Sequence, residues 1–115
     1  MTVDQEEQFQ RIQAFSLDQP NAQLPFSQRL AQESGWLSDY ADRAISEYKK
    51  FVFLAVNAGH PVTPSKVVDQ VWHLHLTYTK SYWLEFCPQV LQTSLHHEPT
   101  QGGTKEEQKF EGWYQ

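Results

Sequence analysis

Histidine and carboxylate side chains gather in two short stretches of the sequence. The first is residues 68–76, Val-Asp-Gln-Val-Trp-His-Leu-His-Leu, and the second is residues 95–99, Leu-His-His-Glu-Pro. Together they contain four of the five histidines. Neutral imidazole is the commonest side-chain ligand for zinc and similar ions, and an aspartate or glutamate can complete such a site. These two stretches are therefore the first candidates for a functional site.

Helical geometry limits which of these groups act together. Asp69 and His73 are four residues apart, so on a helix they share one face. His73 and His75 are two residues apart, which places them about 200° apart around the helix axis. The predicted metal site therefore combines Asp69 and His73 with His96 or His97, and zinc is the candidate ion. Asp69 would be a third ligand or the group that fixes the imidazole tautomer.

The same residues also allow two readings without a metal ion. In the structural one, Asp69 and His73 form a hydrogen-bonded pair that holds the following loop, and His75 is a core histidine with satisfied hydrogen bonds. In the binding one, the region from Asp69 to His97 recognises a small ligand or a protein partner. The candidate contact residues for that role are His75, Tyr78, Tyr82 and Glu98.

Catalysis without a metal ion would use His73 as a base, oriented by Asp69. It would also need a nucleophile, and several hydroxyl and thiol groups are near in sequence: Thr77, Ser81, Cys87 and Ser94. Nothing in the sequence selects one of them. The sequence therefore assigns no catalytic residue and favours a protein that is not an enzyme.

Apolar residues recur at helical spacing along the chain, and no alternating strand pattern competes with them. The predicted helices cover residues 3–17, 25–33, 38–56 and 64–86, followed by a short one after Cys87-Pro88 and a last one from Thr104. We therefore predict an all-α fold: an irregular bundle of about five or six helices around a central buried helix, about residues 64–86. Ser38 is the predicted N-cap of the third helix, and Thr63, followed by Pro64, that of the fourth.

The length of 115 residues predicts one domain, in which residues 1–20 form a peripheral helix and residues 25–115 the core.

The net charge is −5 and the nine basic residues form no stripe, which excludes a nucleic-acid partner. The start is acidic, and the longest apolar run, residues 51–56, is too short to span a membrane. The single cysteine forms no intrachain disulfide. We expect a cytoplasmic protein.

The run from Asp69 to His75 resembles the Asp-x-x-Trp-His-x-His signature of the glycine-rich domain-containing proteins. Tyr78, Tyr82, Cys87 and His97 occupy places comparable to residues that follow the signature in that family, and the bacterial branch is the most similar. The likeness covers residues 26–114 and implies a small helical domain of undefined biochemical role. The chain departs from the family in having only five glycines and no glycine-rich tail.

The sequence thus leads to a first hypothesis of a helical binding module that uses the region from Asp69 to His97. The alternatives are a metal-binding protein or metal-dependent hydrolase that uses Asp69, His73 and His96 or His97, and a purely structural domain.

Overall fold

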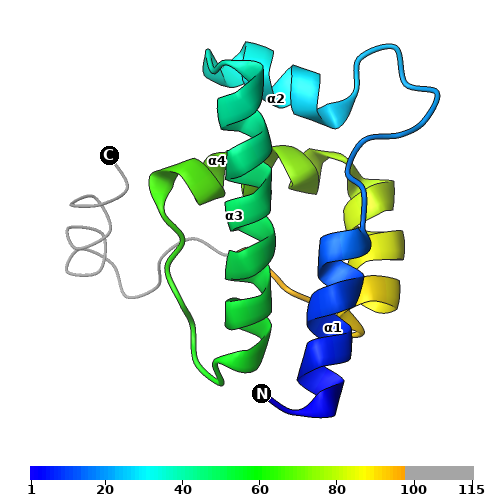
Figure 1. Ribbon diagram of the computed structural model, residues 1–115, viewed down its shortest axis with the longest axis vertical. Helices are drawn as coiled ribbons and strands as arrows, with labels where there is room; N and C mark the ends of the chain where they lie inside the picture. The colour runs from blue at the N-terminus through cyan, green and yellow to red at the C-terminus, as the bar shows by residue number, and fades with distance from the viewer. Residues whose placement is uncertain (98–115) are drawn as a thin grey trace.

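The computed structural model describes residues 1–97, which form five helices and contain no strand (Figure 1). The elements are α1 (Val3–Ala14), α2 (Phe26–Ser34), α3 (Ser38–Asn57), α4 (Lys66–Thr77) and the π-helix η1 (Lys80–Leu91). The predicted all-α fold is confirmed. The glycine turn at residues 102–103 and the helix predicted from Thr104 lie outside the described residues.

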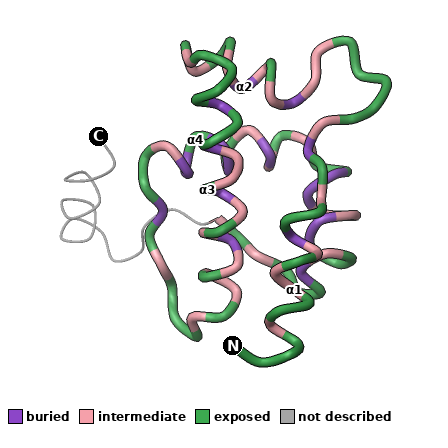
Figure 2. The backbone as a smooth tube through the Cα atoms, in the orientation of Figure 1, coloured by how far each residue is buried: buried purple, intermediate pink, exposed green. Residues whose placement is uncertain are grey.

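The core lies where side chains of α3, α4 and η1 meet, and Figure 2 shows the buried positions along the chain. Each of the two consecutive helices α4 and η1 buries five of its twelve residues. Helix α3 adds the fully buried Tyr48 and Val52, and α1 adds Ile12. Aromatic rings fill much of this core, in agreement with the aromatic content of 14%.

The prediction of one continuous helix over residues 64–86 is wrong, because the helix is interrupted after Thr77. Tyr78 has φ −88° and ψ 70°, and its N–H bonds to the carbonyl of His75. The break contains neither glycine nor proline. An unbroken helix that is apolar on most of its circumference could not cover all its faces in a domain this small. The break lets Tyr82 and Phe86 of η1 pack against His75 of α4.

The start of α4 also differs from the expectation. Ser65, not Thr63, is the N-cap, and its hydroxyl accepts a hydrogen bond from the N–H of Val68 at 3.1 Å. Pro64 therefore precedes the cap instead of occupying the first helical position. At α3 the N-cap is Leu37, and Ser38 is the first helical residue.

Helix η1 continues through Pro88, where the sequence predicted an interruption and a separate short helix afterwards. In a π-helix the N–H of a residue bonds to the carbonyl five residues earlier, so proline forgoes one such bond. The helix ends at Leu91, and Gln92 takes the left-handed conformation with φ 60°. The chain then turns back toward α4 with residues 93–97.

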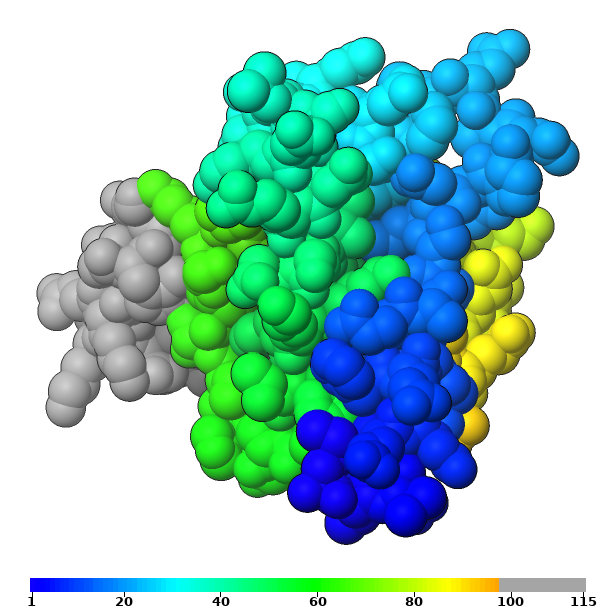
Figure 3. Space-filling model, viewed as in Figure 1, coloured from blue at the N-terminus to red at the C-terminus, as the bar shows by residue number. Residues whose placement is uncertain are grey.

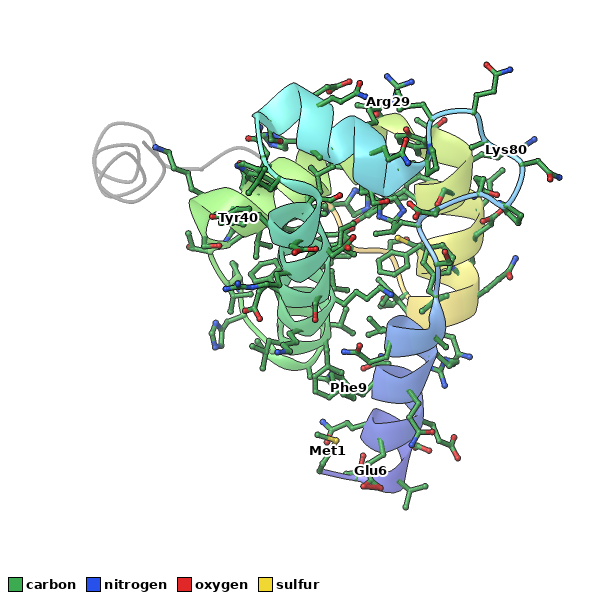
Figure 4. The ribbon with its side chains drawn as sticks, turned by 45° about the horizontal axis from the view of Figure 1, so that its top comes forward. Met1, Glu6, Phe9, Arg29, Tyr40 and Lys80 are labelled. Atoms are coloured by element: carbon green, nitrogen blue, oxygen red, sulfur yellow. The ribbon has the colours of Figure 1, made fainter. Side chains whose placement is uncertain are left out.

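Helices α1 and α3 run side by side in opposite directions and form much of the face seen in Figure 3. Phe9, labelled in Figure 4, meets Phe53 edge to face at 5.1 Å. Asn57 bonds to the side chains of Gln5 and Gln8, and Lys49 bonds to the carbonyl of Phe15 at 2.5 Å. The peripheral N-terminal helix is thus held at both its ends.

Helix α2 lies across the upper end of α3 in Figure 1. It ends at Gly35, which has the left-handed φ of 72° that glycine readily adopts. Its first turn is held from outside: the carboxylate of Asp18 accepts bonds from the N–H and the hydroxyl of Ser27 at 2.8 and 2.9 Å. Across residues 1–97, no helix has the length and apolar character needed to cross a membrane.

Candidate functional site

Asp69 is the centre of the candidate site. It lies in the first turn of α4, which the Ser65 cap begins, and only 4% of its surface is exposed. Its Oδ2 lies 3.6 Å from Nε2 of His73, one turn further along the helix. Its Oδ1 lies 2.6 Å from Nε2 of His97. A buried carboxylate thus lies between two imidazoles, which is the environment that a buried negative charge requires.

His97 reaches this place from the segment that follows η1. Its ring lies flat on the indole of Trp72, with centroids 4.1 Å apart and planes 10° apart. The ring of His73 stacks on the ring of His97, with centroids 4.7 Å apart. Of the two side chains, that of His97 is 11% exposed and that of His73 is 53% exposed. The site therefore has a buried floor and one side open to solvent.

One ligand atom from each of Asp69, His73 and His97 fits within a distance of 4.8 Å of the others. Zinc bonds of about 2.0–2.2 Å to nitrogen and oxygen place two ligands of a tetrahedral ion roughly 3.4 Å apart. The distance from Asp69 to His73 already matches this spacing. The distance of 2.6 Å from Asp69 to His97 is that of a hydrogen bond. An ion that replaced the Nε2 proton would move these two atoms about 0.8 Å further apart.

His96 is exposed and directed elsewhere. Its ring contacts that of Trp83 on η1 at 5.1 Å. It is not part of the group of ligand atoms formed by Asp69, His73 and His97. The sequence left the choice between His96 and His97 open, and in the structure only His97 faces Asp69.

His75 is fully buried on the opposite side of α4. Its Nδ1 lies 2.7 Å from the hydroxyl of Tyr48, and its Nε2 lies 3.1 Å from the hydroxyl of Ser81. Burial lowers the pKa of His75 to about 3, because the charged imidazolium would lose its water. His75 is therefore a neutral histidine that joins α3, α4 and η1. It is not a surface residue available to a ligand.

The other predicted contact residues are dispersed. Tyr78 lies at the break between α4 and η1, where its ring packs against Phe26 at 5.3 Å. Tyr82 is fully buried: its hydroxyl accepts a bond from Nε1 of Trp72 at 3.0 Å and donates one to the carbonyl of Leu95. Burial raises the pKa of Tyr82 and keeps its hydroxyl protonated. Glu98 lies outside the described residues.

Three of the four nucleophile candidates are engaged elsewhere. Cys87 is buried, and burial raises the pKa of its thiol, which opposes the thiolate form that a nucleophile needs. The hydroxyl of Ser81 contacts His75 rather than His73, and the hydroxyl of Thr77 donates to the carbonyl of Leu74 at 2.6 Å. Ser94 is exposed in the segment after η1.

Sequence reasoning missed Trp72 and the role of Tyr82. Trp72 lies directly before His73, and its ring forms the floor under His97. The only sequence signal was its position three residues after Asp69, on the same side of a helix. The bond from Tyr82 to Leu95 had no local signal, because it depends on how η1 folds back against α4.

The comparisons with known proteins identify a family but no biochemical activity. The family model described as UCP032817-like matches residues 7–114, nearly the whole chain. No curated protein and no solved structure matches. The expected membership of the glycine-rich domain-containing proteins is wrong; it rested on the Asp-x-x-Trp-His-x-His motif combined with the later Tyr78, Tyr82, Cys87 and His97. The chain belongs to the UCP032817-like family.

Proposed function

We propose that this protein is a divalent metal-binding domain whose centre consists of Asp69, His73 and His97. The observation that carries the proposal is the convergence of these three side chains from two separate segments, with ligand atoms within 4.8 Å of one another. Two imidazoles and one carboxylate form a donor set that zinc and other first-row divalent ions accept.

The surroundings of the three residues support a site with an open coordination position. Three protein ligands leave a fourth position on a tetrahedral ion, and such positions hold water or a substrate in catalytic zinc sites. The half-exposed His73 lies at the solvent side, so an ion can enter there, whereas Asp69 and Trp72 close the inner side. An ion would displace the Nε2 proton that now lies between His97 and Asp69.

This proposal takes up the metal-binding alternative in place of the first hypothesis, a module that binds a small ligand or a protein partner. In it, the ligand of the region from Asp69 to His97 is a metal ion. Its open position would accept water, a small anionic or neutral donor, or a side chain of a protein partner. A hydrolytic role would require the first of these, because a bound water becomes a nucleophile when the ion lowers its pKa.

The test is metal titration of the full chain without a histidine tag, after treatment with a chelator. We expect Zn²⁺ and Co²⁺ to bind with a stoichiometry of one, measured by calorimetry and by elemental analysis after dialysis. Asp69→Asn, His73→Ala and His97→Ala should each weaken the affinity at least tenfold.

His96→Ala is the matched control, because it removes the neighbouring imidazole that faces Trp83. This variant should bind Zn²⁺ and Co²⁺ as tightly as the wild type does. Equal affinity in the wild type and His97→Ala, or no uptake of either ion by the wild type, would overturn the proposal.

A further inference from the structure

Two hydrogen bonds link the backbone of the segment that carries His97 to η1: the N–H of Thr93 bonds to the carbonyl of Cys87, and the carbonyl of Leu95 accepts a bond from a tyrosine hydroxyl. Tyr82 is fully buried in η1, and its hydroxyl accepts a hydrogen bond from the indole N–H of Trp72 at 3.0 Å. The same hydroxyl donates its proton to the carbonyl of Leu95, two residues before His97. Trp72 also supplies the ring on which His97 stacks. One side chain thus fixes both the floor under His97 and the backbone that leads to it.

We propose that Tyr82 is the positioning residue that holds His97 over Asp69 and thereby sets the metal affinity of the centre. The part that concerns metal affinity rests on the proposed function. Tyr82 contacts none of the three ligand side chains through its hydroxyl; it acts through Trp72 and Leu95. Groups that orient ligands in this way typically change metal affinity by about 10–100-fold when they are removed.

The hydroxyl is essential to this role because one of its bonds reaches the ring under His97 and the other reaches the backbone before His97. Tyr82→Phe retains the ring and its packing against His75 and Phe86. It leaves the carbonyl of Leu95 without the phenolic donor and the indole N–H of Trp72 without its acceptor. The segment of residues 93–97 then keeps the bond from Thr93 to η1 but loses the hydrogen bond nearest to His97, and His97 spends less time over Asp69.

Tyr48→Phe is the matched control. Among residues 1–97, Tyr48 is the other fully buried tyrosine, and its hydroxyl also makes a hydrogen bond, at 2.7 Å to His75. Its removal deletes the same chemical group from the same core, on the side of α4 away from His97. An effect that appears in both Tyr48→Phe and Tyr82→Phe is therefore a general loss of stability. An effect that appears only in Tyr82→Phe concerns the metal centre.

The first measurement uses metal-free protein and does not depend on the proposed function. Because the indole ring of Trp72 lies flat on His97, the ring protons of His97 should show an upfield ring-current shift in NMR spectra. We expect this shift in the wild type and in Tyr48→Phe, and its loss in Tyr82→Phe. An unchanged shift in Tyr82→Phe overturns the positioning role, whatever the metal measurements give.

The second measurement is the affinity for Co²⁺ together with the visible spectrum of the bound ion. Tyr82→Phe should bind Co²⁺ about tenfold more weakly and show altered absorption bands at saturation, because one ligand is held less firmly. Tyr48→Phe should retain the wild-type affinity and spectrum. Equal effects of the two variants overturn the proposal. If the wild type binds no metal but Tyr82→Phe still loses the His97 shift, the proposed function fails and the positioning of His97 by Tyr82 is supported.

Discussion

His73 and His75 are two residues apart on α4 and lie in opposite environments. The side chain of His73 is half exposed beside Asp69, whereas His75 is fully buried against Tyr48 and Ser81. The angle of about 200° between them follows from the helical repeat. One histidine is thus available for a ligand, and the other belongs to the core.

The buried His75 predicts a loss of stability in acid. Its pKa is about 3 in the folded protein, below the ordinary value of 6.5 that applies to the unfolded chain. Between these two pH values the unfolded chain binds a proton at His75 that the folded protein does not bind. The stabilisation that comes from the neutral, buried His75 is therefore complete above pH 6.5 and decreases as the pH falls toward 3. The free energy of unfolding should decrease by roughly 1 kcal/mol for each pH unit in this range.

Urea denaturation at pH 7, 6, 5 and 4 measures this dependence. His75→Gln keeps a polar group in the core but does not titrate, so its free energy of unfolding should depend less on pH over the same range. Parallel curves for the variant and the wild type would show that another group causes the acid sensitivity.

His97→Ala should destabilise the metal-free protein by about 2 kcal/mol. The variant removes a hydrogen bond to a buried carboxylate and the stacking on Trp72, and each interaction of this kind contributes on the order of 1 kcal/mol or more. His96→Ala should change the free energy of unfolding by less than about 0.5 kcal/mol, because His96 is exposed. Chemical denaturation in the presence of a chelator compares the two. The prediction is wrong if the two adjacent substitutions have the same effect.

His73→Ala should have little effect without metal and a clear effect with it. The contact of His73 with Asp69 is 3.6 Å long and half exposed, and such pairs contribute about 0–1 kcal/mol. With a bound ion, His73 becomes one of three ligands. Addition of Zn²⁺ should raise the melting temperature of the wild type by linkage and raise that of His73→Ala much less. Thermal scans with and without Zn²⁺ test this prediction. An equal rise in the melting temperature of both proteins would exclude His73 as a ligand.

The start of α4 gives a prediction that separates the structure from the sequence pattern. Ser65→Ala removes the hydroxyl that accepts from the N–H of Val68 and should cost about 1 kcal/mol. Thr63→Ala should have almost no effect, although Thr63 was the predicted cap. The ratio of the two effects in urea denaturation tests the assignment. A larger cost for Thr63→Ala would favour the cap predicted from the sequence.

Local patterns predicted much of the molecule. The apolar spacing predicted the all-α fold and the positions of the first three helices, because helical periodicity depends on neighbours three and four residues apart. The pairing of Asp69 with His73 and the separation of His73 from His75 followed from the same repeat. The choice of His97 over His96 did not follow from it. In a loop, the sequence does not show which of two adjacent histidines points toward Asp69.

The sequence by itself determined a helical chain with a carboxylate and an imidazole on one face, since both properties depend on contacts within about one helical turn. Only the tertiary structure decided the break after Thr77, the passage of η1 through Pro88 and the return of residues 93–97 to α4. These features arise because buried aromatic surface is shared between segments far apart in the chain. Asp69 and His97 are 28 positions apart, and the sequence between them carries no local signal that these two side chains meet.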